Sequence, residues 1–147
     1  MIETVTFPEL TVLGCMVEAS HEDLPAALAA AWERVFAADV GTAAFAAVSL
    51  PEENGLRREL VGFMAAKASE IPDGMVRLDL DAGRYLRTVQ DGPQAAIAGG
   101  FARLRAHAEA QGLTLSGMAL DFGHRPEQPD GRHELHLALA PQLPALA

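Results

Sequence analysis

The chain has 147 residues and a formal net charge of −9, from 11 lysines and arginines against 20 aspartates and glutamates. This length fits one domain with a sizeable core. The negative charge argues against a protein whose main task is to grip nucleic-acid phosphates, because electrostatic repulsion would oppose binding.

The sequence carries no signal for export or membrane insertion. No apolar run reaches the ~20 residues needed to cross a bilayer, and the N-terminus lacks the basic start and apolar stretch of a signal peptide. A cytoplasmic location is therefore expected. Cys15 is the single cysteine, so an intrachain disulfide and a cysteine-based metal cluster are excluded.

The first half of the chain predicts a strand, a helix and two further strands. Residues 4–19 alternate loosely between apolar and polar types, as in a strand. A helix is expected to begin near Pro25, because proline is tolerated in a first helical turn. Residues 45–50 and 59–67 read as two strands of a hairpin, with an Asn-Gly dipeptide at its tip.

The second half predicts the same order of elements after a turn at residues 71–74. Residues 75–90 form a long strand that is interrupted at residues 82–83. A helix follows, and the last two strands lie within residues 113–122 and 132–140.

Residues 51–60 and 126–135 match without a gap at an offset of 75, with the same Pro, Glu, Arg, Glu and Leu. The helices also align, since Trp32 and Phe101 lie 69 residues apart on their apolar stripes. The chain therefore predicts one α+β domain over residues 1–147, built from duplicated βαββ units. The halves cover about residues 4–70 and 75–141, related by a pseudo-two-fold, with a mostly antiparallel sheet and helices on one face.

Several catalytic signatures are absent, including a phosphate-binding loop, HExxH and GxSxG. His133 and His136 are three residues apart in a strand and should point to opposite faces, so no metal site is expected from them. His124 and His136 can approach across the last hairpin. Asp121 is a candidate anionic group because it lies next to Phe122, although it can also simply end a strand facing water. No cofactor is expected.

Residues 74–85, followed by Asp91-Gly92-Pro93, resemble the GyrI-like effector-binding domains, which also occur at the C-terminus of AraC-type and MerR-type regulators. The shared features are a Gly-Met, an alternating strand, an Ala-Gly-Arg-Tyr-like turn and a Gly-Pro that starts a helix. Residues 32–36, 60–63 and 120–122 resemble the family's first helix, third strand and acidic-aromatic strand. The resemblance covers residues 4–141.

The resemblance implies two βαββ units with a small-molecule cleft along their seam, for lipophilic or cationic aromatic compounds. It leaves no sequence for a helix-turn-helix module, so a stand-alone domain is expected. Two departures weaken the preference for cations. Gly123 stands where cation-binding members carry Glu, and Phe63 and Met64 follow a glycine where many members carry a Glu or an aromatic residue. An apolar or neutral ligand is therefore an equal alternative.

These observations favour a small-molecule binding domain of the transcription-regulator type, with no direct nucleic-acid or membrane partner. The candidate ligand-binding residues are Trp32, Phe36, Phe63, Tyr85, Phe122 and the carboxylate of Asp121. Core packing is the alternative role of each aromatic residue. Two other functions remain open: a hydrolase of reactive small electrophiles, in which Tyr85 orients water with a pocket carboxylate, and an acidic protein-interaction module resembling a gyrase modulator. The sequence leaves the oligomeric state open.

Overall fold

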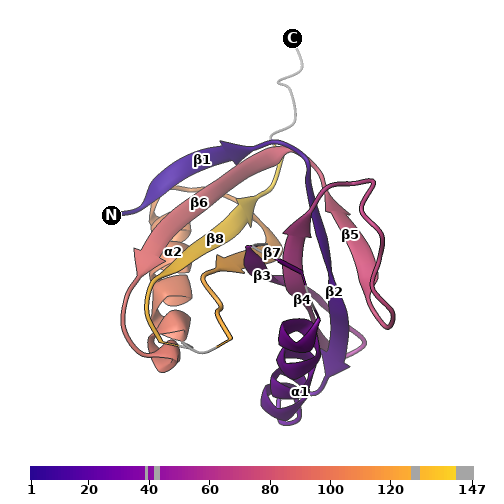
Figure 1. The fold of residues 1–147 in the computed structure, drawn as a ribbon. Helices are drawn as coiled ribbons and strands as arrows, with labels where there is room; N and C mark the ends of the chain where they lie inside the picture. Colours follow the sequence, from indigo (N-terminus) through magenta and orange to yellow (C-terminus); the bar gives the residue numbers. More distant parts are fainter. Residues whose placement is uncertain (39, 42–43, 127–129, 142–147) are drawn as a thin grey trace.

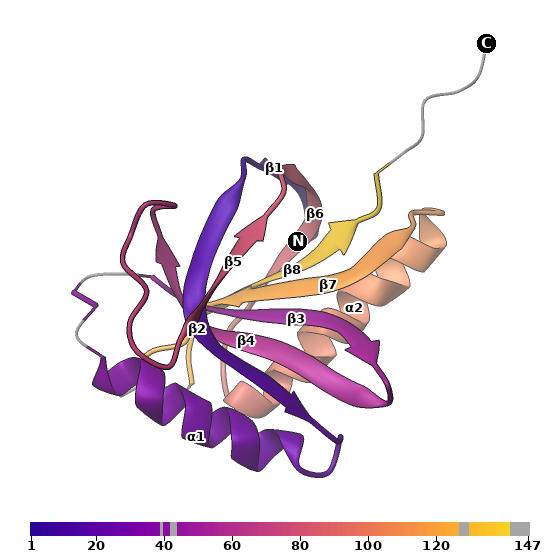
Figure 2. The ribbon, with the colours of Figure 1, turned by 90° about the vertical axis from the view of Figure 1, so that its right-hand side faces the viewer.

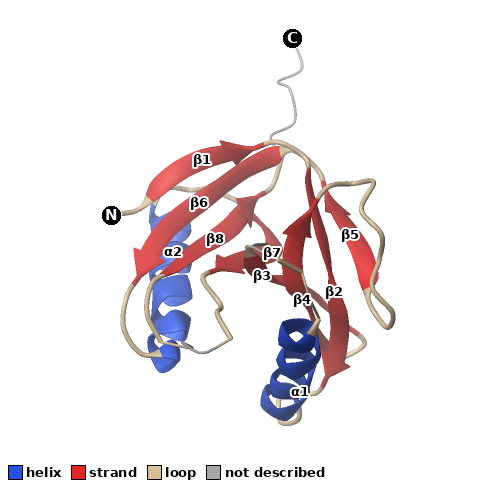
Figure 3. Cartoon of the chain, in the orientation of Figure 1, coloured by secondary structure: helices blue, strands red, loops and turns tan. Residues whose placement is uncertain are grey.

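The computed structural model describes residues 1–38, 40–41, 44–126 and 130–141. Eight strands form one sheet, and two α-helices lie on one face of it (Figures 1 and 3). Among these residues, no helix is long and apolar enough to cross a membrane. The elements in chain order are β1 (Glu3–Phe7), β2 (Leu10–Ala19), α1 (Leu24–Ala37), β3 (Phe45–Glu53), β4 (Leu56–Ala65), β5 (Val76–Leu80), β6 (Gly83–Gln90), a 3-10 turn (Gln94–Ala96), α2 (Ile97–Ala110), β7 (Leu115–Phe122) and β8 (His133–Leu139).

The strand order confirms the predicted duplication. The sheet runs β1-β6-β8-β7-β3-β4-β2-β5, and every neighbouring pair is antiparallel. β2-α1-β3-β4 forms one βαββ unit and β6-α2-β7-β8 forms the other. The units meet where β3 pairs with β7, so the pseudo-two-fold lies between these two strands. Of the second repeated segment, residues 127–129 lie outside the described residues.

Each unit is completed by an edge strand that comes from the other half of the chain. β1 precedes the first unit but pairs with β6 of the second, and β5 precedes the second unit but pairs with β2 of the first. The single strand expected over residues 4–19 is therefore two strands, separated at Pro8 and Glu9. Proline has no backbone N–H to give to a strand ladder, which fits a break at this point. The expected interruption at residues 82–83 coincides with the change from β5 to β6.

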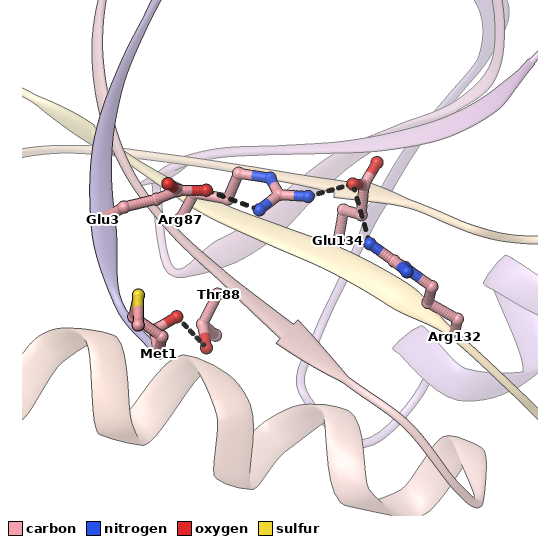
Figure 4. A network of polar contacts seen from close by, with 6 residues as sticks. All are labelled: Met1, Glu3, Arg87, Thr88, Arg132 and Glu134. Carbon is pink, nitrogen blue, oxygen red and sulfur yellow. Dashed lines mark hydrogen bonds and ion pairs between the residues drawn. The ribbon is translucent and has the colours of Figure 1, made fainter.

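Arg87 of β6 holds the exchanged strand β1 in place (Figure 4). Its guanidinium donates one hydrogen bond to Glu3 of β1 at 2.7 Å and another to Glu134 of β8. The Thr88 hydroxyl adds a hydrogen bond of 3.3 Å to the carbonyl oxygen of Met1. One planar guanidinium thus connects three adjacent strands, a role that suits its fork of donors.

The face of the sheet away from the helices is curled around one apolar cluster. Figure 2 shows how strongly the strands twist across the sheet. Every strand contributes at least one residue to this cluster, so the sheet must wrap around it rather than lie flat. Its members include Val5, Phe7, Val12, Val48, Leu60, Leu80, Tyr85, Leu120, Phe122 and Ala138.

The helices occupy equivalent positions, but their residues correspond differently from the sequence prediction. Both helices have 14 residues, and they begin 73 residues apart at Leu24 and Ile97. Phe101 is therefore the counterpart of Leu28. The predicted pairing of Phe101 with Trp32 is wrong because both fall on apolar stripes, which align at several offsets.

The hairpin alignment at an offset of 75 is also wrong in register. Leu60 packs in the cluster away from the helices, whereas Leu135 packs beneath α2. A shift of one residue moves a strand residue to the other face of the sheet, so these two leucines cannot be equivalent. The predicted turn is confirmed: Asn54 and Gly55 have φ of 54° and 77°, as a type I′ hairpin requires.

Gly62 is predicted to be indispensable for the pairing of β2 with β4. It lies opposite Gly14, and a Cβ atom on Gly62 would overlap the carbonyl oxygen of Leu13. Gly62→Ala should lower the free energy of unfolding by about 3 kcal/mol or more, measured by urea denaturation. Gly99→Ala is the control, because Gly99 is an exposed residue of α2 where a Cβ atom would meet nothing within 4 Å. That variant should gain up to ~1 kcal/mol of helix propensity. Equal stabilities for the two variants would contradict the predicted clash between a Cβ atom at position 62 and the backbone of β2.

Candidate functional site

A cleft of about 890 Å³ lies between α1 and α2, above the strands at the seam. It exists because α1 packs on β2 and β4, while α2 packs on β6 and β8. The central strands β3 and β7 are left without a helix of their own. The side chains that they present on this face are small at Ala47, Ser49 and Ala119, so the space between the helices is not filled.

The cleft has mainly apolar walls and a polar floor. The residues from α1 are Leu24, Pro25, Leu28, Ala29 and Trp32, and those from the 3-10 turn and α2 are Gln94, Ala95, Ile97, Ala98 and Phe101. The remaining residues, from the strands and the turn after β7, are Ala47, Ser49, Glu59, Ala119, Asp121 and His124. A neighbouring hollow of about 750 Å³ shares Ser49, Glu59 and Phe101 and extends toward Arg57 and Arg105. An elongated apolar ligand therefore has room along the seam.

Asp121 connects two imidazole rings at one end of the floor. One carboxylate oxygen lies 2.7 Å from His133 Nδ1, and the other lies 3.0 Å from His124 Nε2. The His124 ring stacks on the Trp32 indole, with a centroid distance of 4.4 Å and an interplanar angle of 27°. This network spans α1, β7 and β8 and fixes the Trp32 ring against the cleft.

Gly123 allows the network to form. Its φ is 142°, a backbone conformation that side-chain-bearing residues rarely adopt. A Cβ atom there would overlap the carbonyl oxygen of Arg132 and lie 2.9 Å from the Cα of His133. The chain thus approaches β8 closely at this point, which brings His124 to the same side as His133.

Glu59 is the second acid of the cleft floor. It lies on β4 opposite Ser49 of β3. Burial raises the pKa of the Glu59 carboxyl, and the nearby Asp121 charge adds to the effect. Arg57, His124 and the Ser49 hydroxyl act in the opposite direction without cancelling it. A carboxylate whose charge is poorly solvated is a natural partner for a cation.

The structure brings only part of the predicted ligand site to this cleft. Trp32 and Asp121 line it. Phe36 stacks on Trp32 at 5.0 Å and, with Phe63, packs in the core beneath α1. Tyr85 and Phe122 belong to the cluster on the opposite face of the sheet.

Two histidine expectations have different outcomes. His136 faces the aromatic cluster of Phe7, Tyr85 and Phe122, whereas His133 bonds Asp121 on the cleft side, so their opposite orientation is confirmed. The expected approach of His124 to His136 is wrong: the His124 ring centroid lies 5.0 Å from that of His133 on the cleft side, whereas His136 packs with Tyr85 on the other face of the sheet. Tyr85 and Asp121 lie on opposite faces of the sheet, so the structure does not bring them together in one site.

Sequence reasoning did not find Glu59, Phe101 or His124 as site residues. The sequence places Glu59 in the repeated polar segment, but in the structure it is the inward-facing residue just before the apolar run of β4. The alternation of β4 carried a signal, because Glu59, Val61 and Phe63 share one face. His124 offered no comparable signal, since it follows the strand and is positioned by Gly123.

Removing the charge of Glu59 should stabilise the protein. The folded state binds this proton more tightly than the unfolded chain, so the free energy of unfolding falls as pH rises from the ordinary value of 4.5 through the raised pKa. At neutral pH, Glu59→Gln should gain about 0.5–2 kcal/mol, and the gain should shrink in acid, as followed by thermal unfolding at several pH values. Glu33→Gln, on the exposed side of α1, should change little. If Glu59→Gln instead destabilises the protein at neutral pH, the favourable interactions of the charged carboxylate with Arg57 and Ser49 outweigh the cost of its burial.

The sequence matches no family profile and no curated protein, but the fold matches solved structures over 95% of the chain. SAV2435 bound to tetraphenylphosphonium aligns with a TM-score of 0.72 and 12% identity over 94% of its length. The C-terminal domain of EcmrR aligns with a TM-score of 0.68 and 12% identity over 97% of its length. A hydrolase encoded by lin2189 from Listeria innocua aligns with a TM-score of 0.61 and 8% identity over 91% of its length. At such identities the likeness concerns the fold alone. The fold expected from the resemblance to the GyrI-like effector-binding domains is thereby confirmed.

Proposed function

We propose that the chain is a small-molecule binding domain whose cleft takes lipophilic organic cations. The observation that carries the proposal is the Glu59 carboxylate, placed at the floor of an apolar cleft whose walls include Trp32 and Phe101. Such a site offers apolar contact, ring faces and one negative charge to the same ligand.

The walls favour an apolar, ring-bearing ligand. Leu24, Leu28 and Ile97 supply aliphatic surface, and Trp32 supplies the largest ring. Each Å² of apolar surface that a ligand buries contributes roughly 25 cal/mol before the cost of association. The face of an indole also attracts cations, by about 0.5–2 kcal/mol.

The charge on the floor favours a positive ligand over a neutral one. Glu59 is already poorly solvated in the free protein, so a bound cation would recover electrostatic energy without first stripping water from the carboxylate. Asp121 contributes less free charge because both its oxygens are engaged by imidazoles. The net charge of −9 also raises the local concentration of cations.

The solved structures of the same fold support this reading. The structure of SAV2435 contains bound tetraphenylphosphonium, a lipophilic cation, and the EcmrR domain belongs to a protein found in complex with DNA. Gly123 stands where cation-binding members of the resembled family carry a Glu. In our proposal, the Glu59 carboxylate takes the place of that missing acid. The hydrolase alternative loses its proposed catalytic pair, since Tyr85 does not line the cleft.

Titration with tetraphenylphosphonium should change the fluorescence of Trp32, the single tryptophan. Glu59→Gln should weaken binding roughly tenfold, or about 1.4 kcal/mol, because it removes one charge and preserves the shape. Tetraphenylmethane-like neutral analogues with solubilising groups should bind equally to both proteins. Glu33→Gln should bind the cation as the unmodified protein does. All titrations should contain a chelator to remove divalent ions.

Two results would refute the proposal. One is the absence of saturable binding below millimolar tetraphenylphosphonium. The other is an affinity that Glu59→Gln leaves unchanged, which would place the cation elsewhere or assign its binding to apolar contact alone.

A further inference from the structure

We propose that Asp121, His124 and His133 form a binding site for a divalent transition-metal ion of the Zn²⁺ or Co²⁺ type, at the end of the cleft. Two imidazoles and one carboxylate are a donor set that suits these ions. The proposal goes beyond small-molecule binding and does not depend on it, since it requires no organic ligand.

The three ligand atoms are already close together. One nitrogen from each histidine and one oxygen of Asp121 all lie within 4.8 Å of one another. In a tetrahedral site with bonds of about 2.1 Å, neighbouring ligand atoms are about 3.4 Å apart. Small side-chain rotations therefore suffice to bring all three onto one ion. Within residues 1–38, 40–41, 44–126 and 130–141, no other trio of such residues meets this condition.

The ligands are also held in position before any ion arrives. The side chains of His133, Asp121 and His124 are 2%, 9% and 11% exposed. The Trp32 indole stacks on His124 and limits the rotation of its ring. Gly123 fixes the close approach that places His124 beside β8. Such pre-organisation lowers the conformational entropy that metal binding must overcome.

The site is open on the side of the cleft. Asp121 and His124 line the cleft while His133 closes the site from β8. An ion held by three protein ligands would have a remaining position directed to that space, the arrangement of metal sites that bind water or a ligand. Glu59 lines the same cleft as Asp121 and His124, and the charges of both act on the Glu59 carboxyl, so a second carboxylate stands beside the site.

The present hydrogen bonds of Asp121 to the two histidines do not prevent metal binding. A neutral imidazole carries one N–H and one bare nitrogen, and which nitrogen holds the hydrogen can change. Coordination through His124 Nε2 and His133 Nδ1 requires the hydrogen to move to the other ring nitrogen. The two contacts from Asp121 to the rings would then be replaced by bonds to the shared ion.

The test is a titration of the chelator-treated protein with Co²⁺ in the absence of any organic ligand. We expect saturation at one equivalent of Co²⁺ per chain, well below millimolar concentration. The visible absorption bands of the bound Co²⁺ should be those of an ion with fewer than six ligands. Because Trp32 stacks on His124, Co²⁺ should quench its fluorescence, and Zn²⁺ should reverse the quenching by displacement. Zn²⁺ should also raise the melting temperature.

His124→Gln, His133→Ala and Asp121→Asn should each weaken Co²⁺ binding at least tenfold. His107→Ala is the matched control: it also removes one of the five histidines, and it lies in the last turn of α2, outside the trio. It should bind Co²⁺ as the unmodified protein does. Circular dichroism identifies any variant that fails to fold.

Failure of the unmodified protein to bind one equivalent overturns the proposal, whatever the variants do. Binding that His124→Gln, Asp121→Asn and His107→Ala weaken equally would assign it to surface histidines and overturn it as well. Tetraphenylphosphonium binding in the presence of chelator is measured separately, so failure of the metal site leaves the organic-cation proposal standing, and the reverse also holds.

Discussion

The pairing of β3 with β7 is the contact on which the rest of this structure depends. It joins two βαββ units into one continuous sheet and sets the pseudo-two-fold between them. Because each helix packs on the two outer strands of its own unit, the helices flank this seam rather than cover it. The cleft is therefore a geometric consequence of duplication, and small side chains such as Ala47 and Ala119 keep it open.

The exchange of edge strands makes the two units interdependent. β1 and β5 each complete the other unit's half of the sheet, and Arg87 secures one of these exchanges by pairing with Glu3 and Glu134. Residues of all eight strands then share the cluster behind the sheet. Neither half could bury this cluster alone, so contacts far from the cleft also join the two units.

The distribution of acids gives the cleft its character. Asp121 is engaged by two histidines, and Glu59 faces the apolar space with a raised pKa. The glycine at position 123 serves a backbone purpose, since it permits the approach of His124 to β8. The cleft floor thus contains a histidine-carboxylate cluster and, apart from it, a poorly solvated carboxylate, so it offers two different electrostatic environments.

The two βαββ units predicted from the sequence are present, although the residue matches that suggest them are out of register. Local patterns in the sequence correctly predict the order of the elements within each unit, the turn at Asn54 and the opposite faces of His133 and His136. All of these rest on local periodicity and on backbone conformations that only a few residues adopt. The sequence patterns do not show that β1 and β5 pair with strands of the other unit or that Tyr85 lies behind the sheet. They also do not show that Glu59, Phe101 and His124 line one cleft with Trp32 and Asp121. These outcomes depend on which strands pair across the two units. A period-2 pattern says that a residue faces inward but does not say which of two faces becomes the cleft, because that choice belongs to the contacts between the halves.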